Sequence, residues 1–153
     1  MDNTLIFRNF NFDDLYDILN IYNFHIINSL ANFEETPIKS QEFLKTCTNI
    51  VNSKIPFIVC EKKSKIIGFA FLNNFRKKSG YRFVFEDSIY LDKDRIGEGI
   101  GSRLLKELII SASKNKNIKS IIAVIGDSNA DASIKIHEKN GFKMIGKLKN
   151  VGF

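Results

Sequence analysis

The chain has 153 residues and a formal net charge of +6 at neutral pH, and 44% of its residues are hydrophobic against 26% charged. This balance predicts one soluble globular domain with a single core and excludes a disordered chain. No apolar run is long enough to span a bilayer, so no membrane segment is expected, and the acidic N-terminus predicts no secretory signal. The positive charges are scattered rather than gathered into a stripe, which argues against nucleic acid as a partner.

The first half of the chain predicts a strand, two helices and a β-hairpin. Apolar residues recur on one face of each expected helix, and Ser40 is expected to cap the second one. A short turn joins the two hairpin strands. In chain order we expect a strand at 4–10, a helix at 12–27, a loop at 28–37, a helix from Ser40, and strands at 57–61 and 65–72.

The second half predicts alternating strands and helices. A continuous apolar run, SIIAVI, is typical of a strand covered on both faces, and Asn140-Gly141 ends the short helix that follows it. In chain order we expect a basic loop at 76–80, a long strand at 81–91, a helix after Gly101, a strand at 120–125, a helix at 130–139 and a last strand at 142–148. These elements predict an α/β domain in which a mixed sheet carries helices on both faces.

The chain contains three glycines at alternate positions, Gly97, Gly99 and Gly101, directly before a helix. Glycine allows the backbone to approach a bound group closely, and the first turn of a helix offers unpaired N–H groups at its positive end. This arrangement favours a phosphate or pyrophosphate. A Walker loop is excluded because no Gly-Lys-Ser/Thr follows, and the spacing differs from the G-x-G-x-x-G of dinucleotide sites. The alternative is a glycine-rich connection that binds nothing.

The order of these elements, with the glycine loop before one helix and Gly-Phe after a later one, resembles the GNAT-type N-acetyltransferases. Four segments are similar to the phosphinothricin and methionine sulfoximine N-acetyltransferases: IYNFHIINSLANFEETP, FRKKSGYRFVFEDSIYL, GEGIGSRLL and SNADASIKIHEKNGFKMIGKLKNVGF. The resemblance implies one domain over residues 1–153, with a mostly antiparallel, twisted sheet that is splayed at its central strands. The similar proteins continue into a further strand beyond Phe153, which we expect to be missing here.

The resemblance also implies acetyl-CoA as co-substrate and no metal. The pyrophosphate would lie on the glycine loop, and the pantetheine arm would enter the gap between the long strand and the strand at 120–125. Ile96 stands where the superfamily usually has Arg or Gln, but backbone N–H groups make most phosphate contacts. The implied cofactor-binding residues are Ile89, Tyr90, Leu91, Ile96, Gly97, Glu98, Gly99, Ile100, Gly101, Ser102, Asn129 and Ser133. An N-cap is the alternative role for Asn129.

Two residues are candidates for proton transfer. Glu86 lies among apolar neighbours in FVFEDSIY, on the same strand face as Val84 and Ser88, so its pKa should be raised and it could act as general base. The alternative is a carboxylate paired with Arg82. His137 stands where many of the resembling proteins place the acid that protonates the thiolate, although a structural histidine bonded to a backbone carbonyl is equally compatible.

The candidate substrate residues are Phe33, Arg76, Lys78 and Tyr81. Arg76 could hold the carboxylate or phosphinate of a small amino-acid analogue, with Phe33 as a wall of its pocket. Lys78 stands where the family usually carries a second arginine, and lysine cannot make the same bidentate contact. The basic loop could instead be a solvated hairpin connection. The acceptor could instead be a protein N-terminus or a different amine, and the chain could be a CoA-binding module without turnover.

The two cysteines, Cys47 and Cys60, lack the spacing of a metal site and are expected to be buried thiols in a reducing compartment. His25 is expected to be structural. The resemblance further implies a cytoplasmic homodimer that acts on a small-molecule amine.

Overall fold

The computed structural model describes residues 4–126 and 130–151, and within these ranges it shows a five-stranded sheet in the order β1-β2-β3-β4-β5. The first four strands pair antiparallel and β5 lies parallel to β4. Their bounds are Ile6–Asn9, Phe57–Lys62, Lys65–Asn74, Val84–Leu91 and Ser120–Ile122. The expected mixed, mostly antiparallel sheet is therefore confirmed.

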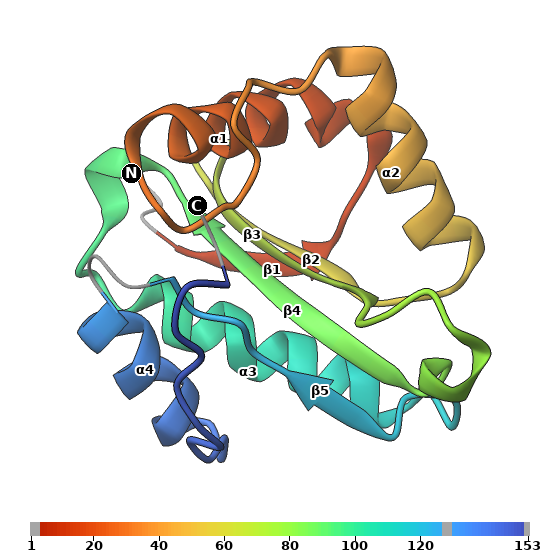
Figure 1. Ribbon diagram of the computed structural model, residues 1–153. Helices are drawn as coiled ribbons and strands as arrows, with labels where there is room; N and C mark the ends of the chain where they lie inside the picture. Colours follow the sequence, from red (N-terminus) through yellow and green to blue (C-terminus); the bar gives the residue numbers. More distant parts are fainter. Residues whose placement is uncertain (1–3, 127–129, 152–153) are drawn as a thin grey trace.

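Helices cover both faces of the sheet, with α1 and α2 on one face and α3 and α4 on the other (Figure 1). Their bounds are Leu15–Asn28, Ser40–Asn52, Ile100–Ser113 and Ala130–Lys139, and three-residue 3₁₀ turns occupy Phe12–Asp14, Ser79–Tyr81 and Lys93–Arg95. Each long helix buries one apolar stripe against the sheet, as its periodicity predicts. The core is consequently divided into two layers by the strands.

The layer beneath α1 and α2 is rich in aromatic rings. Phe57, Phe69 and Phe71 lie within 6.1 Å of one another, measured between ring centroids, and Tyr90 lies 5.4 Å from Phe69. The layer beneath α3 is aliphatic and includes Leu104 and Leu108, both fully buried. Because rings and branched side chains fill both sides of β3, this strand is rigidly held, and so is β4 beside it.

The β-hairpin between β2 and β3 turns at Lys63 and Ser64, whose φ angles are 51° and 59°. Two consecutive residues with positive φ are typical of a type I′ turn, which matches the twist of the strands on either side. The buried thiols of Cys47 and Cys60 are also as expected. Burial raises the pKa of Cys47 to about 12 and that of Cys60 to about 11, so both stay protonated at neutral pH.

Several expectations about local structure were wrong. Ser40 does not cap α2; it is the first residue of the helix, and Lys39 occupies the cap position without a side-chain hydrogen bond. The long strand begins at Val84 rather than at 81, because Tyr81 belongs to a 3₁₀ turn whose backbone N–H bonds the Lys78 carbonyl. Local turn hydrogen bonds therefore compete successfully with extension of the strand.

The C-terminal part differs most from expectation. β5 ends at Ile122 rather than at 125, because its pairing with β4 stops at the pair Glu86–Ile122. Residues 142–148 form no strand, and Ile145 is 97% exposed. A segment with strand-like alternation stays irregular when no neighbouring strand supplies backbone hydrogen bonds. Within the described residues β5 is accordingly an edge strand, so the splay lies at the edge of the sheet and not at its centre.

Candidate active site

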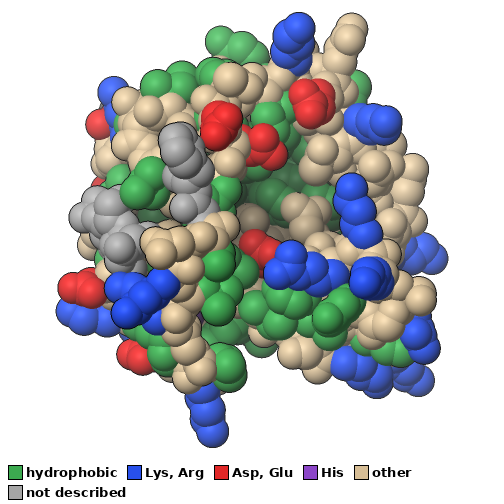
Figure 2. Space-filling view, in the orientation of Figure 1, with side chains coloured by type: hydrophobic (Ala, Val, Ile, Leu, Met, Phe, Trp, Pro, Cys, Tyr) green, Lys and Arg blue, Asp and Glu red, His purple; other side chains and the backbone are tan. Residues whose placement is uncertain are grey.

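A cavity of about 310 Å³ opens where β4 and β5 separate. β4 and the segment after β5 form its walls, the loop after α1 covers it, and His137 of α4 closes one end. Figure 2 shows a hollow in this face of the molecule, with hydrophobic walls and charged side chains around it. The volume lies at the lower end of the range for small-molecule sites.

Glu86 lines the cavity from the α1 face of β4. Its neighbours Phe85 and Asp87 point to the other face, as strand alternation predicts. Burial raises the pKa of Glu86, the adjacent Asp87 raises it further, and Arg76 offsets part of the rise. Within residues 4–126 and 130–151 no cation lies close enough to form an ion pair with Glu86, and Arg82 bonds the Ser79 carbonyl instead. The raised pKa that the sequence predicts is confirmed.

His137 lies on α4 and is 6% exposed. Its Nδ1 lies 2.7 Å from the Ser133 carbonyl oxygen, and its Nε2 lies 2.9 Å from Oδ2 of Asp87. Both oxygens accept hydrogen bonds, so the arrangement matches an imidazole with a proton on each ring nitrogen; Oγ of Ser133 also lies 3.4 Å from Nδ1. Burial alone would lower the pKa of His137, but the hydrogen bond and charge of Asp87, with the Ser133 carbonyl, raise it above its ordinary value.

The glycine loop has the backbone that an anion site requires. Gly97 and Gly99 have φ angles of 90° and 76°, in the left-handed region that favours glycine. Gly99 occupies the N-cap of α3 without a side chain, so the first N–H groups of this 14-residue helix face outward uncapped. Ile96 is 63% exposed, and Arg95 forms a 3.3 Å ion pair with Glu98. These residues fit a pyrophosphate held mainly by backbone groups.

The loop after α1 and the end of α1 itself are held over the cavity by contacts to β4 and to the segment after β5. Nδ2 of Asn32 donates a 3.1 Å hydrogen bond to the Tyr90 hydroxyl. The Leu30 carbonyl lies against Gly126, where a Cβ atom would overlap it. His25, at the end of α1, donates from Nε2 to the Leu91 carbonyl at 2.7 Å, so it acts structurally, as expected. The roof of the cavity is therefore tied to both β4 and the segment after β5.

The structure brings only part of the predicted site together. Phe33 lines the cavity although it is 56% exposed, and Ile89, Tyr90 and Ser133 line it as well. Arg76, Lys78 and Tyr81 do not line it. Arg76 is exposed and stacks over the Phe75 ring at 4.8 Å, so it influences Glu86 by charge and not by contact. Asn129 lies outside the described residues.

Sequence reasoning missed two kinds of site residue. Asp87 is absent from the predicted site although it interrupts the apolar alternation of Phe85 and Ile89, and an acid at such a position is a usable signal. Asn32 and Asn73 also line the cavity, but they come from a loop and a strand end. No pattern in the sequence marks either asparagine, because only the pairing of β3 with β4 places Asn73 opposite Glu86.

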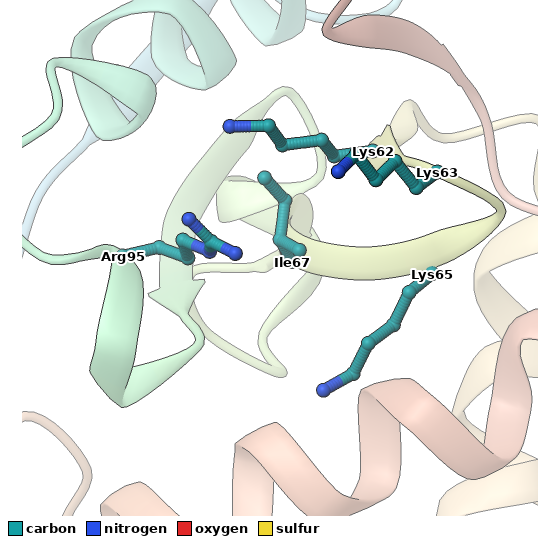
Figure 3. Close-up of a pocket in the computed structure, with 5 residues that line it drawn as sticks. All are labelled: Lys62, Lys63, Lys65, Ile67 and Arg95. Carbon is teal, nitrogen blue, oxygen red and sulfur yellow. The ribbon is translucent and has the colours of Figure 1, made fainter. Parts of the chain in front are cut away.

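A second, shallower cavity of about 380 Å³ lies beside the β2–β3 turn. Figure 3 shows Arg95 extending toward Ile67 from one side, and Lys62 and Lys63 from the hairpin on the other. Lys65, which also lines it, lies 3.5 Å from Asp92. Its basic lining contrasts with the acidic and apolar lining of the first cavity, and it contains none of the predicted catalytic residues.

Neither a metal-binding group nor a membrane-spanning helix is found among the described residues. No group of three or more His, Cys, Asp or Glu side chains there could hold a metal ion. None of the helices in the described ranges is long and apolar enough to cross a membrane.

Comparison with known proteins identifies this architecture. The acetyltransferase (GNAT) domain family matches residues 7–153. The chain is 38% identical to phosphinothricin N-acetyltransferase of Alcaligenes faecalis, over 92% of this chain and 71% of that protein. It is 31% identical to an L-methionine sulfoximine/L-methionine sulfone acetyltransferase of Pseudomonas aeruginosa, over 91% and 80%.

Two solved structures are similar across almost the whole chain. A phosphinothricin acetyltransferase from Sinorhizobium meliloti in complex with acetyl-CoA is 35% identical with a TM-score of 0.90, covering 98% of this chain and 80% of that one. A ribosomal-protein-alanine N-acetyltransferase from Brucella melitensis is 34% identical with a TM-score of 0.91, covering 97% and 90%. With the glycine loop and the separation of β4 from β5, these findings show that the chain belongs to the GNAT family and is an acetyl-CoA-dependent N-acetyltransferase.

Proposed function

We propose that this enzyme acetylates the amino group of a small amino-acid analogue of the phosphinothricin or methionine sulfoximine type. The observation that carries the proposal is the placement of Glu86 in a small cavity at the separation of β4 and β5. Its carboxylate has a raised pKa and no ion-pair partner among the described residues. The likeness to enzymes named for these two substrates supports the choice.

In this proposal the acetyl group passes directly to the amine, and Glu86 is the general base. When bound, acetyl-CoA supplies an activated acetyl group and a thiolate leaving group. The α-amino group of an amino acid is largely protonated at neutral pH, so a base that removes its proton increases the reactive fraction. Glu86 accepts that proton directly or through water, and its raised pKa brings it closer to the operating pH.

The other residues bind, orient and supply charge. The uncapped N–H groups at the start of α3, on residues Ile100 to Ser102, hold the pyrophosphate. The strand residues Ile89 to Leu91 would hold the pantetheine arm and would polarise the thioester carbonyl through their backbone N–H groups. His137 lines the cavity, its pKa is raised by Asp87, and it is the candidate donor of the proton that the sulfur takes up.

The substrate end of the cavity lies under the loop after α1. Phe33 forms part of its wall, and Asn73 offers an amide opposite Glu86. Arg76, which lies outside the cavity lining like Lys78 and Tyr81, attracts an anionic group of the substrate by its charge. A cavity of about 310 Å³ beneath a tied loop suits a small molecule better than a polypeptide, which would need an open groove.

A protein N-terminus is the second candidate acceptor, and the likeness to a ribosomal-protein-alanine N-acetyltransferase favours it. A thiol-release assay separates the two. It would compare phosphinothricin, methionine sulfoximine, methionine sulfone, ordinary amino acids, a polyamine and a peptide with N-terminal alanine. Turnover of the amino-acid analogues alone is expected. Faster turnover of the peptide would overturn the small-molecule assignment, and binding of acetyl-CoA without turnover of any amine would indicate a non-catalytic module.

We also propose that the enzyme is a cytoplasmic homodimer. Two buried, protonated thiols are compatible with a reducing compartment. A dimer would cover some of the exposed apolar side chains, such as Tyr16 and Ile145. Light scattering at micromolar concentration tests the assembly, and a monomer mass would contradict it.

A further inference from the structure

Asp87 is buried in the cavity wall with one of its two oxygens unused. Oδ2 is bonded to His137, but Oδ1 has no hydrogen-bond partner within the part of the chain that the structure describes. The side chain is 2% exposed and lines the cavity. A buried carboxylate oxygen without a donor is costly, so such an atom in a native protein is expected to accept a hydrogen bond from a water or a ligand.

The position of Asp87 determines which ligand this is. It is the first residue of β4 beyond the last pair with β5, Glu86–Ile122, so it stands where the two strands separate. It points toward the α4 face, whereas Glu86 points toward the α1 face, where the amine substrate is expected. In the proposed function the pantetheine arm of acetyl-CoA would lie in this gap, and it has two secondary amides and therefore two N–H donors.

We propose that Oδ1 of Asp87 accepts a hydrogen bond from an amide N–H of the pantetheine arm, with His137 holding the carboxylate in place through Oδ2. This inference rests on the proposed function. The ion pair leaves the dyad neutral overall, so the cavity wall presents an oriented acceptor without an isolated buried charge. Asp87 thereby selects the register in which the arm lies along β4.

The test uses the folded enzyme and measures binding, not turnover. The probes are CoA and two CoA analogues, each with one amide N–H replaced by an ester oxygen, titrated calorimetrically. Loss of a hydrogen bond to a charged acceptor should weaken binding of one analogue roughly 10- to 150-fold in the wild type. Asp87→Leu should bind that analogue and CoA nearly equally, because it has no acceptor.

Asp87→Asn is the second variant, because it keeps the shape of the side chain and serves if the leucine variant does not fold. It should discriminate less between CoA and the ester analogue than the wild type does, because its acceptor is neutral. Glu86→Gln is the matched control: it should lose turnover yet discriminate between CoA and the ester analogue as the wild type does. Equal binding of CoA and both analogues by the wild type would overturn the inference. The proposed function would then still stand or fall on the thiol-release assay.

Discussion

Glu86 and Asp87 are adjacent in sequence and chemically unlike. Glu86 lines the cavity from the α1 face without an ion-pair partner in the described residues, whereas Asp87 faces α4 and is hydrogen-bonded to His137. Strand alternation alone separates them. A single strand can therefore present one carboxylate, Glu86, whose pKa burial raises, and another, Asp87, that is hydrogen-bonded to a histidine of a neighbouring helix.

The largest expected effect comes from removing the carboxylate that faces the open cavity. Glu86→Gln keeps the size of the side chain but cannot accept a proton, so kcat at pH 7 should fall by about 10²–10⁴-fold with cofactor affinity retained. Activity should recover in part at higher pH, where free amine is plentiful. Steady-state kinetics across pH would check this, with Glu138→Gln on the exposed face of α4 as control. Full activity at pH 7 would place the base elsewhere.

The second effect concerns the carboxylate paired with His137. His137→Ala leaves Asp87 buried without its cation and should destabilise the fold by about 3–5 kcal/mol. Because the folded pKa of His137 is raised, its contribution is fully present below about pH 6.5 and is lost as pH rises through the folded value. Urea unfolding at several pH values should show this slope in the wild type and not in the variant. An identical slope in both proteins would mean that the pair does not stabilise the fold.

The third effect is smaller because Arg76 acts on Glu86 from outside the cavity. Arg76→Ala should raise KM for an anionic amino-acid analogue by about 2- to 5-fold, as for an exposed ionic contact, with less change in kcat. It should also move the acidic limb of the pH–rate profile to higher pH, because Arg76 lowers the pKa of Glu86. Lys77→Ala in the same loop is the control. An unchanged KM in Arg76→Ala would mean that Arg76 is a solvated surface residue without a role in substrate binding.

The smallest effect concerns how stability changes with pH. For Glu86 this change has the opposite sign to that of an ordinary ion-paired carboxylate. The raised folded pKa of Glu86 means that the folded state favours its protonated form, so stability is lost as pH rises above the ordinary carboxyl value of about 4.3. Glu86→Gln should then melt slightly higher than the wild type at neutral pH, by on the order of 1 °C, and equally at pH 4. A lower melting temperature at neutral pH would identify Glu86 as a structural residue.

Sequence patterns predict the parts of this protein that depend on local chemistry. The apolar stripe of α3, the positive φ angles at Gly97 and Gly99, and the burial of Glu86 all follow from residue type and spacing. Asp87 and its bond to His137 do not, since they lie 50 residues apart and meet only because α4 packs beside β4. The missing strand at 142–148 shows the same limit, because a strand requires a partner that its own sequence cannot provide.

The contact between Gly126 and the Leu30 carbonyl has a consequence for how such an enzyme can change. Neither residue is a candidate for catalysis, yet any side chain at 126 would push the loop that roofs the cavity. A substitution there would alter which amines fit by displacing the loop that roofs the cavity. Mutational libraries aimed at new acceptor preferences should therefore include this glycine and its loop as a coupled pair, since a change in one will be tolerated only with a compensating change in the other.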